Sequence, residues 1–198
     1  MRTIGITGGV GSGKSELLSY IRTHYNCRVI MADAVAHALE EVGQPCYEAL
    51  VSLLGRDILQ ENGSIHTGRM ATRMFADERL LEKVNHIVHP AVFKWILSEL
   101  HQEEQKGEYD FFFVEAALLL EEHYDTILDE LWYIYTEETV RRSRLMQTRG
   151  YSEDKITQMI GKQLPESEFR MRCQVIIENN GSLEEAYRQI DKRLEAYL

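Results

Sequence analysis

The chain carries Gly8-Gly9-Val10-Gly11-Ser12-Gly13-Lys14-Ser15 near its start, and its architecture can be worked out from this run. The run matches the pattern G-x-x-x-x-G-K-[ST]. Residues 2–7 before it are typical of a short strand, and residues 17–21 after it carry apolar side chains at helical spacing. The run is therefore predicted to form a loop between a strand and the N-terminus of a helix.

Such a loop binds the phosphates of a nucleoside triphosphate. Its glycines let backbone N–H groups point at phosphate oxygens, and the helix end adds a partial positive charge. We expect Lys14 to bridge the β- and γ-phosphates and the Ser15 hydroxyl to ligate Mg²⁺. The alternative, a merely flexible glycine-rich turn, leaves Lys14-Ser15 and both flanking elements unexplained.

Length and composition favour one globular domain. The 198 residues are 44% apolar, which is enough for a full hydrophobic core. The formal net charge of −10 argues against a nucleic-acid partner, because such proteins present a basic surface. A local group of arginines and backbone amides can still bind a small anionic substrate.

The sequence also predicts a soluble, cytoplasmic protein. Cys27, Cys46 and Cys173 are odd in number and form no C-x-x-C pair, which is typical of reduced, buried thiols. The N-terminus has no long apolar segment of the kind that a signal peptide needs. The longest apolar run, around residues 116–120, is too short to cross a bilayer, so no membrane partner is expected.

A second strand is predicted over residues 27–31, where β-branched side chains occur. It ends at Ala32-Asp33, and a helix follows as far as Val42, stopped by Gly43 and Pro45. Ligands bind at the carboxyl edge of α/β sheets, so Asp33 is a candidate catalytic group. Asp is also a favoured N-cap, and the residues alone support both interpretations equally.

Residues 43–107 are predicted to form a helical insertion. Apolar stripes indicate helices over residues 47–54, 70–75, 80–88 and 92–100, with His89-Pro90 between the last two. A crossover between parallel strands needs only about a dozen residues. We therefore expect this longer segment to be the subdomain that binds the phosphoryl acceptor.

The apolar run of residues 109–114 is typical of a central parallel strand that is buried on both faces. It ends at Glu115. An acid in this position, facing the phosphate loop, is expected to assist Mg²⁺. The alternative, an exposed acid that merely follows a strand, is equally open from the residues alone.

A further strand is predicted over residues 131–135, with Thr136 as the N-cap of the next helix. This helix carries Arg141, Arg142, Arg144 and Arg149. A solvated helix face would explain them, and so would a mobile lid whose arginines stabilise a transferring phosphoryl group.

The last strand, residues 175–177, precedes a turn at residues 179–181 and a final helix. Ser182 and Glu185 have the spacing of a capping box at the start of that helix. The order of the elements predicts an α/β fold with a parallel sheet and helices on both sides.

The ordered set of motifs resembles the dephospho-CoA kinase family over essentially the full length of the chain. The matching stretches are residues 5–15, Ala32-Asp33, residues 63–65, residues 86–90, residues 115–121, residues 144–146 and residues 176–181. The resemblance implies an ATP- and Mg²⁺-dependent kinase that phosphorylates the ribose 3′-hydroxyl of dephospho-CoA, which is the last step of coenzyme A synthesis.

The resemblance also implies a single kinase domain, residues 1–198, in three parts. These are a three-layer P-loop core (about 1–42, 108–138 and 173–198), a helical acceptor-binding insertion (about 43–107) and a lid (about 139–172).

Matching positions imply roles for single residues. Asp33 corresponds to the acid that orients and deprotonates the attacking hydroxyl, and Lys14 and Arg144 are the other catalytic groups. Ser15 and Glu115 are the implied metal ligands. The implied ATP-binding residues are Gly9, Gly11, Ser12, Gly13, Lys14, Ser15 and Glu16.

The chain also departs from the family pattern. Glu115 replaces a usual Asp, which moves the carboxylate by one methylene. The other departures are Glu16 for Thr, His37 and Thr67 for basic residues, Phe169 for Lys, and Cys173-Gln174 for Ala-Asp. They leave the ATP assignment intact and the individual acceptor contacts unassigned.

Two other functions compete with this interpretation. Another small-molecule P-loop kinase would share the phosphate loop and differ in its acceptor. A nucleotide-dependent switch would need D-x-x-G and N-K-x-D motifs, neither of which we find in the sequence.

Overall fold

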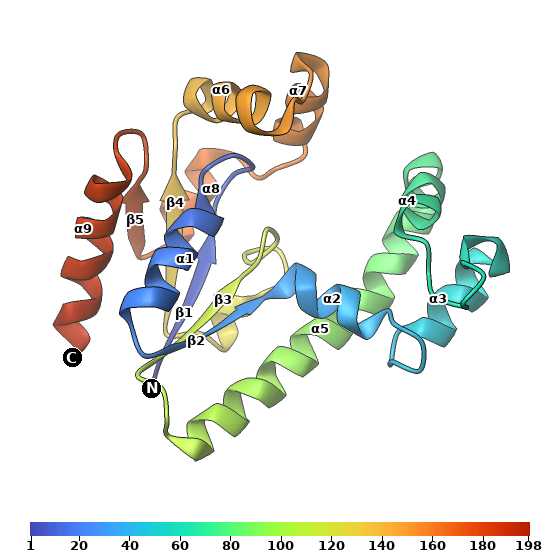
Figure 1. The fold of residues 1–198 in the computed structure, drawn as a ribbon, viewed down its shortest axis with the longest axis horizontal. Coiled ribbons are helices and arrows are strands. Elements are labelled where there is room, and N and C mark those ends of the chain that lie inside the picture. Colours follow the sequence, from blue (N-terminus) through green and yellow to red (C-terminus); the bar gives the residue numbers. More distant parts are fainter. The chain divides into compact units, whose positions relative to one another are not determined.

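The computed structural model describes residues 1–198 and is an α/β protein. Its five-stranded parallel sheet has the order β2-β3-β1-β4-β5 (Figure 1). The strands are β1 (Arg2–Thr7), β2 (Cys27–Met31), β3 (Phe111–Glu115), β4 (Glu130–Tyr135) and β5 (Val175–Glu178). The helices are α1 (Lys14–His24), α2 (Ala32–Leu39), α3 (Tyr47–Leu54), α4 (Thr67–Ala76), α5 (Glu78–Lys106), α6 (Glu138–Arg149), α7 (Glu153–Gly161), α8 (Glu166–Arg172) and α9 (Leu183–Leu194). The expected α/β class is confirmed.

The chain divides into two compact units. The first contains Met1–Val29 and Glu103–Leu198, and therefore β1, α1, β3, β4, β5 and the helices from α6 onward. The second, Ile30–Gln102, is almost entirely helical. The first unit holds the phosphate loop, and the second holds Asp33.

β1 is the central strand of the sheet, and it pairs with β3 on one side and β4 on the other. Ile6 lies opposite Glu115 of β3 and opposite Trp132 of β4. Because all these pairs are parallel, the three strands end at the same edge of the sheet. The sequence element that follows β1 at this edge is the phosphate loop.

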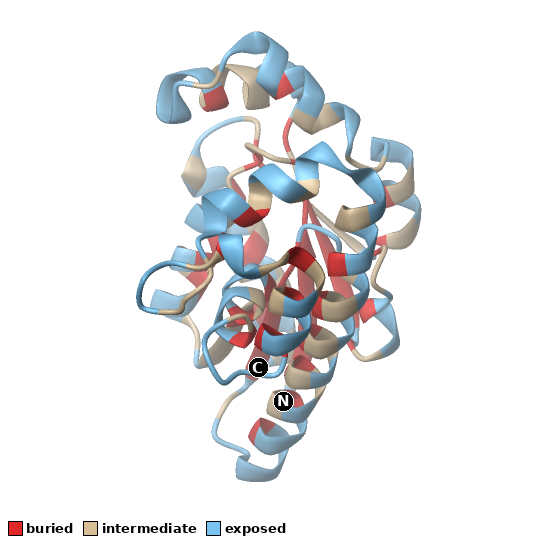
Figure 2. Ribbon diagram, turned by 90° about the vertical axis from the view of Figure 1, so that its right-hand side faces the viewer, coloured by how far each residue is buried: buried red, intermediate tan, exposed pale blue.

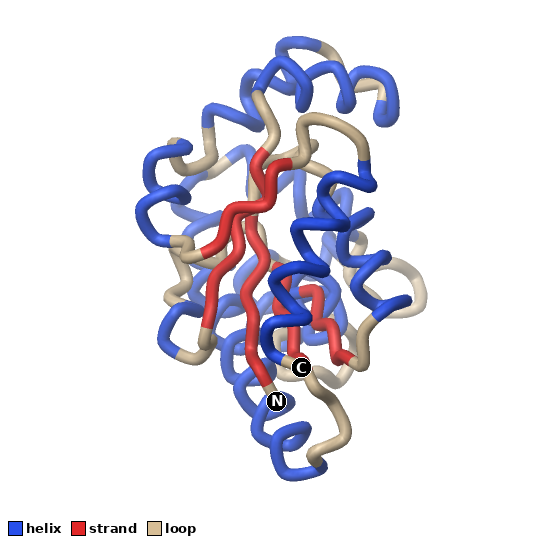
Figure 3. The backbone as a smooth tube through the Cα atoms, turned by 90° about the vertical axis from the view of Figure 1, so that its left-hand side faces the viewer, coloured by secondary structure: helices blue, strands red, loops and turns tan.

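Helices cover both faces of the sheet (Figure 3). On one face the ring of Phe111 makes an edge-to-face contact with Tyr25, which follows α1. On the other face the ring of Tyr133 stacks on Phe169 of α8, with 4.8 Å between ring centroids. α1 also packs against α9.

The core of the first unit is built around β3. Phe111, Phe112, Phe113 and Val114 are all almost fully buried, which confirms that this strand is covered on both faces. Figure 2 shows the strands coloured as buried, with the exposed residues on the helices and loops around them. This rigid centre fixes the position of Glu115 at the end of the strand.

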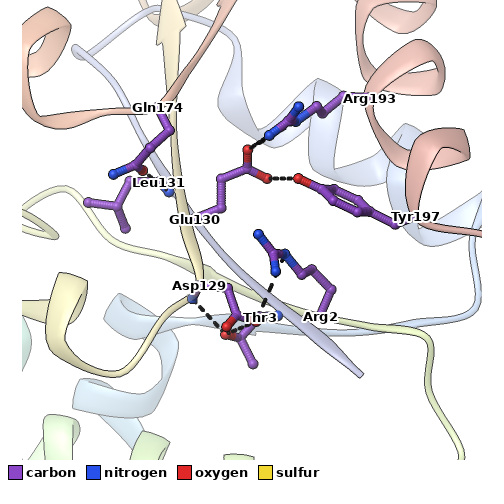
Figure 4. Close-up of polar contacts among 8 residues, drawn as sticks. All are labelled: Arg2, Thr3, Asp129, Glu130, Leu131, Gln174, Arg193 and Tyr197. Carbon is purple, nitrogen blue, oxygen red and sulfur yellow. Dashed lines mark hydrogen bonds and ion pairs between the residues drawn. The ribbon is translucent and has the colours of Figure 1, made fainter.

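The C-terminal segment is bonded to the sheet through Glu130, the first residue of β4, at the end of the strand away from the phosphate loop (Figure 4). This carboxylate is almost fully buried and accepts hydrogen bonds from the Arg193 guanidinium and from the Tyr197 hydroxyl, the latter at 2.8 Å. Burial alone raises the pKa of Glu130, but these hydrogen bonds outweigh burial and hold its pKa below the ordinary value. Nearby, Asp129 accepts hydrogen bonds from the backbone N–H and the hydroxyl of Thr3, both at 2.9 Å.

The second unit differs from the prediction in one element. The two helices expected on either side of His89-Pro90 are a single helix, α5, with Pro90 inside it. The apolar stripe explains the difference, because Val84, Val88, Val92, Ile96 and Leu100 are all buried and keep a spacing of four residues across the proline. Proline removes one backbone hydrogen bond, and this continuous buried face keeps the helix intact.

Helix α2 is shorter than expected and ends at Leu39 instead of Val42. Beyond it the backbone forms turns, with Gln44 N–H donating to the carbonyl of Glu41 at 2.9 Å. Gly43 has a φ of 80° and lies within these turns, beyond Glu40, the C-cap of α2, so it is not the residue that ends the helix.

The connection before α4 is a tight turn around Asn62. The Asn62 side chain accepts hydrogen bonds from the backbone N–H and the hydroxyl of Ser64, at 3.0 and 2.7 Å. Leu59 and Ile65 form an isolated antiparallel bridge across it. Arg69 of α4 donates a 2.7 Å hydrogen bond to the carbonyl of Leu59, which attaches the helix to the turn.

The three cysteines are free thiols, as expected. Burial raises the pKa of Cys27 to about 11 and that of Cys173 to about 12. Both side chains therefore stay protonated near neutral pH and are poor nucleophiles. No helix combines the length and the apolar character that crossing a membrane requires.

Candidate active site

The phosphate loop connects the end of β1 to the start of α1. Gly13 is the N-cap of α1 and has a φ of 86°, a left-handed conformation that glycine adopts without strain. A Cβ at this position would lie 2.5 Å from Asn179 Nδ2, so a side chain has no room. No side chain caps the helix at Gly13, so the loop presents an uncapped helix N-terminus, which favours an anion.

Lys14 lies inside this loop. Its Nζ donates a 2.7 Å hydrogen bond to the carbonyl of Gly8 and lies 3.8 Å from Glu115 Oε1. Glu115 is buried, so the interpretation of an exposed acid after a strand is wrong. The structure thus brings together two of the predicted site residues, Lys14 from the start of α1 and Glu115 from the end of β3.

Two residues from the second half of the chain, Asn179 and Thr136, contact the backbone of the phosphate loop. Asn179 Nδ2 donates a 2.7 Å hydrogen bond to the carbonyl of Ser12. The Thr136 hydroxyl lies 3.1 Å from the same carbonyl and 3.1 Å from that of Asn179. The prediction that Thr136 caps the next helix is wrong, because the N-cap of α6 is Glu137 and the Thr136 hydroxyl is committed to the loop.

The four arginines of α6 have different surroundings, which the sequence could not show. Arg141 Nη1 lies 3.4 Å from the carbonyl of Val10, and Arg144 Nη2 donates a 3.0 Å hydrogen bond to the carbonyl of Asn179. Arg142 instead pairs with Glu138 and Glu153 within the helices α6 and α7. Arg149 is exposed near the end of α6.

A close approach explains Gly9. A Cβ on this residue would overlap with Arg141 Nη1, so glycine leaves room for the arginine in its present position against the loop. α6 follows β4 directly and lies at the same end of the sheet as the phosphate loop (Figure 1). Arg141 and Arg144 are therefore the two arginines of α6 that reach the loop or the segments that hold it.

Three residues at this site were missed or misread from the sequence. Asn179 lies at the carboxyl end of β5, and the rule that ligands bind at this edge could have singled it out. Thr136 follows β4 in the same way. Gln163 has no local signal, because it lies in a turn after α7 and reaches the loop only through the fold: its Oε1 accepts a 3.2 Å hydrogen bond from Val10 N–H.

Ser15 and Glu16 lie in the first turn of α1, and both are exposed. The charge of Glu16 is felt at Tyr187 of α9, where it contributes to a raised pKa whose main cause is burial of the phenol. Ser12, in contrast, is buried, and its backbone N–H donates to the carbonyl of Gly9 at 3.1 Å.

Asp33 lies in the first turn of α2, directly after β2, and is exposed. The N-cap of this helix is Met31, and no side chain caps it. The interpretation of Asp33 as an N-cap is therefore wrong, and the carboxylate has no capping role that would explain it.

These residues suit a nucleotide and a divalent cation. Uncapped N–H groups, a lysine and two arginines are donors that match phosphate oxygens. The hydroxyl of Ser15 and the carboxylate of Glu115 are hard oxygen ligands of the kind that Mg²⁺ prefers. Ser12 Oγ and Asn179 Oδ1 are buried at the loop without a hydrogen-bond partner in the protein, which marks the site as polar and incompletely satisfied.

A family model described as dephospho-CoA kinase matches residues 2–185. The chain belongs to this family. A dephospho-CoA kinase from Shouchella clausii is 32% identical over 187 residues, which cover 94% of each chain. One from Geobacillus kaustophilus is 34% identical over 95% of this chain and 92% of its own. The resemblance noted in the sequence is thereby confirmed.

Solved structures show the same fold. The crystal structure of TT1252 from Thermus thermophilus has a TM-score of 0.82 and 29% sequence identity, and the match covers 98% of this chain and 97% of that one. A dephospho-CoA kinase from Campylobacter jejuni covers both chains fully, with a TM-score of 0.73 and 20% identity. The overall fold of this chain is therefore shared with these proteins over almost its whole length.

Proposed function

We propose that this protein transfers the γ-phosphoryl group of ATP to the ribose 3′-hydroxyl of dephospho-CoA, which yields coenzyme A and ADP. The observation that carries the proposal is the family match over residues 2–185, joined to an intact phosphate loop with Lys14 in place. The transfer breaks the bond between the γ-phosphorus and the β,γ-bridging oxygen of ATP, which leaves on the β-phosphate of ADP. It forms a bond between that phosphorus and the 3′-oxygen, whose proton leaves.

The proposed part of the loop is to bind and orient the triphosphate. Backbone N–H groups at the start of α1 take the phosphate oxygens, and Lys14 bridges the β- and γ-phosphates. We place Gly9, Gly11, Ser12, Gly13, Lys14, Ser15 and Glu16 in this binding site. In this scheme Lys14 exchanges the carbonyl of Gly8 for phosphate oxygens when the nucleotide enters.

Asp33 is the proposed base. Its carboxylate would accept the proton of the 3′-hydroxyl and hold that oxygen in line with the γ-phosphorus. Two observations support the role: Asp33 directly follows a strand of the sheet, and it has no capping function in α2. The helical insertion of about residues 43–107 is the proposed acceptor-binding part, and the segment of about residues 139–172 is the proposed lid.

Ser15 and Glu115 would hold Mg²⁺, which neutralises phosphate charge when bound. Glu115 lies on a rigid buried strand, so its carboxylate is well positioned for this task. Arg144 would stabilise charge on the transferring phosphoryl group. Its hydrogen bond to the Asn179 carbonyl keeps it near the loop before the nucleotide binds. We propose a cytoplasmic enzyme whose partners are small molecules.

The test measures ADP production from ATP and Mg²⁺ with dephospho-CoA, adenosine, AMP or buffer alone. We expect strong stimulation by dephospho-CoA and little by the others. Equal slow hydrolysis in all four mixtures would contradict the proposal and direct attention to a different acceptor.

A further inference from the structure

Gln163 reaches the phosphate loop from the turn after α7. Its side-chain oxygen accepts a 3.2 Å hydrogen bond from Val10 N–H and lies 3.4 Å from Arg141 Nη1. Both neighbours are donors, so the carboxamide must present its oxygen to them and not its NH₂ group. One neutral oxygen therefore faces two hydrogen-bond donors. Val10, which carries one of them, is 153 residues away from Gln163 in the sequence.

The two donors are of the types that bind phosphate. Backbone N–H groups of this loop and arginine guanidinium groups are the usual partners of phosphate oxygens. The glycine at position 9 keeps the place open: a Cβ there would lie 3.3 Å from Gln163 Oε1 and would overlap with Arg141 Nη1. The oxygen of Gln163 thus lies where a phosphate oxygen would find the same partners.

The position of Val10 along the loop indicates which phosphate of the nucleotide would accept a hydrogen bond from its N–H group. Lys14 Nζ, the group that bridges the β- and γ-phosphates, is bonded to the carbonyl of Gly8, two residues before Val10. The helix N-terminus, which holds the phosphates nearer the nucleoside, begins at Gly13 on the other side of Val10. Val10 N–H therefore lies at the γ-phosphate end of the loop.

We infer that the side-chain oxygen of Gln163 occupies the place of a γ-phosphate oxygen when that phosphate is absent. ATP displaces it, whereas ADP leaves it bonded to Val10 and Arg141. The residue therefore lowers the affinity for ATP and not that for ADP. This inference rests on the proposed nucleotide site.

The experiment compares the binding of ADP with that of a non-hydrolysable ATP analogue by isothermal titration calorimetry, with Mg²⁺ and without acceptor. Gln163→Ala removes the competing oxygen. We expect the Kd for the ATP analogue to fall about fivefold, the equivalent of one neutral hydrogen bond, while the Kd for ADP stays unchanged.

Gln163→Glu should have the opposite effect. A carboxylate binds Arg141 more strongly and repels the γ-phosphate, so the Kd for the ATP analogue should rise about tenfold. Gln147→Ala is the matched control, because Gln147 is exposed on α6 and bonds only to Ser143 of the same helix. Thermal melting without nucleotide checks that every variant is folded.

The direction in which the Kd for the ATP analogue changes in Gln163→Ala decides whether Gln163 competes with the γ-phosphate. If both Gln163 variants weaken the ATP analogue, Gln163 holds the nucleotide instead of standing in for it. If ADP and the analogue change by the same factor, Gln163 does not act at the γ-phosphate. Either result overturns the inference while the proposed function stands. Failure of the unaltered protein to bind either nucleotide would overturn both.

Discussion

The Asn179 amide donates a 2.7 Å hydrogen bond to the carbonyl of Ser12, and both side chains are almost fully buried. This contact ties the end of the last strand to the phosphate loop, 167 residues earlier. Its removal should therefore affect both the stability of the protein and the shape of the nucleotide site.

We predict that Asn179→Ala lowers the free energy of unfolding by about 1–3 kcal/mol, the cost of a lost buried hydrogen bond. The KM for ATP should rise in the same variant. Urea unfolding followed by circular dichroism and steady-state kinetics measure the two effects. The control is Asn180→Ala, since Asn180 bonds to Glu137 N–H and not to the loop. Equal effects of the two substitutions would contradict the special role of Asn179.

Glu130 should make stability depend on pH. Its pKa is lowered in the folded protein, so its contribution is present above the ordinary Glu pKa and is lost as pH falls through the folded value. Glu130→Gln should cost about 2 kcal/mol near pH 7. The difference from the unaltered protein should shrink below about pH 4.5. Chemical unfolding at a series of pH values measures it, and a difference that grows in acid would refute the prediction.

Asp33→Asn should lower kcat at least about a hundredfold, because it removes the proposed base and keeps the size of the side chain. ATP affinity should be nearly unchanged, since the phosphate loop is untouched. Nucleotide titration and turnover assays separate the two quantities. Glu41→Gln, at an exposed residue just beyond α2, serves as the charge-matched control. Intact turnover in Asp33→Asn would show that Asp33 is not the base.

The proposed role of Glu115 as a Mg²⁺ ligand can be tested by varying the Mg²⁺ concentration. Glu115→Gln should raise the Mg²⁺ concentration for half-maximal activity about tenfold or more, because it removes a charged ligand. Glu115→Asp should keep most of the activity, since the carboxylate remains and only one methylene is lost. Activity titrations with Mg²⁺ at fixed ATP give both values. Identical metal dependence in all three proteins would exclude Glu115 as a ligand.

Local patterns predicted much of this structure correctly. The glycine-rich run, the buried strand ending at Glu115 and the capping box of Ser182 and Glu185 all depend on neighbours in sequence. Errors arose where tertiary contacts override local rules. The proline in α5 is tolerated because a buried stripe continues past it, and Thr136 does not cap its helix because its hydroxyl is used by Ser12 and Asn179.

Within the site, sequence reasoning could name residue types but not their partners. Arg141, Arg142 and Arg144 are nearly adjacent on one helix, yet two reach the loop or its supporting segments and one pairs within the helices. Gln163 could not be found at all, because its contact with Val10 exists only once residues 153 apart are brought together.

The central place of β1 has a consequence for how the protein is made. A ribosome synthesises this strand before its two neighbours in the sheet, β3 and β4, which emerge more than a hundred residues later. The residues of β1 must therefore wait unpaired, since long-range strand pairing cannot begin until the partners exist. The nucleotide loop waits longer still, because Asn179, which completes its support, is synthesised 167 residues after Ser12. A motif that is synthesised before its supports is thus among the last to be assembled.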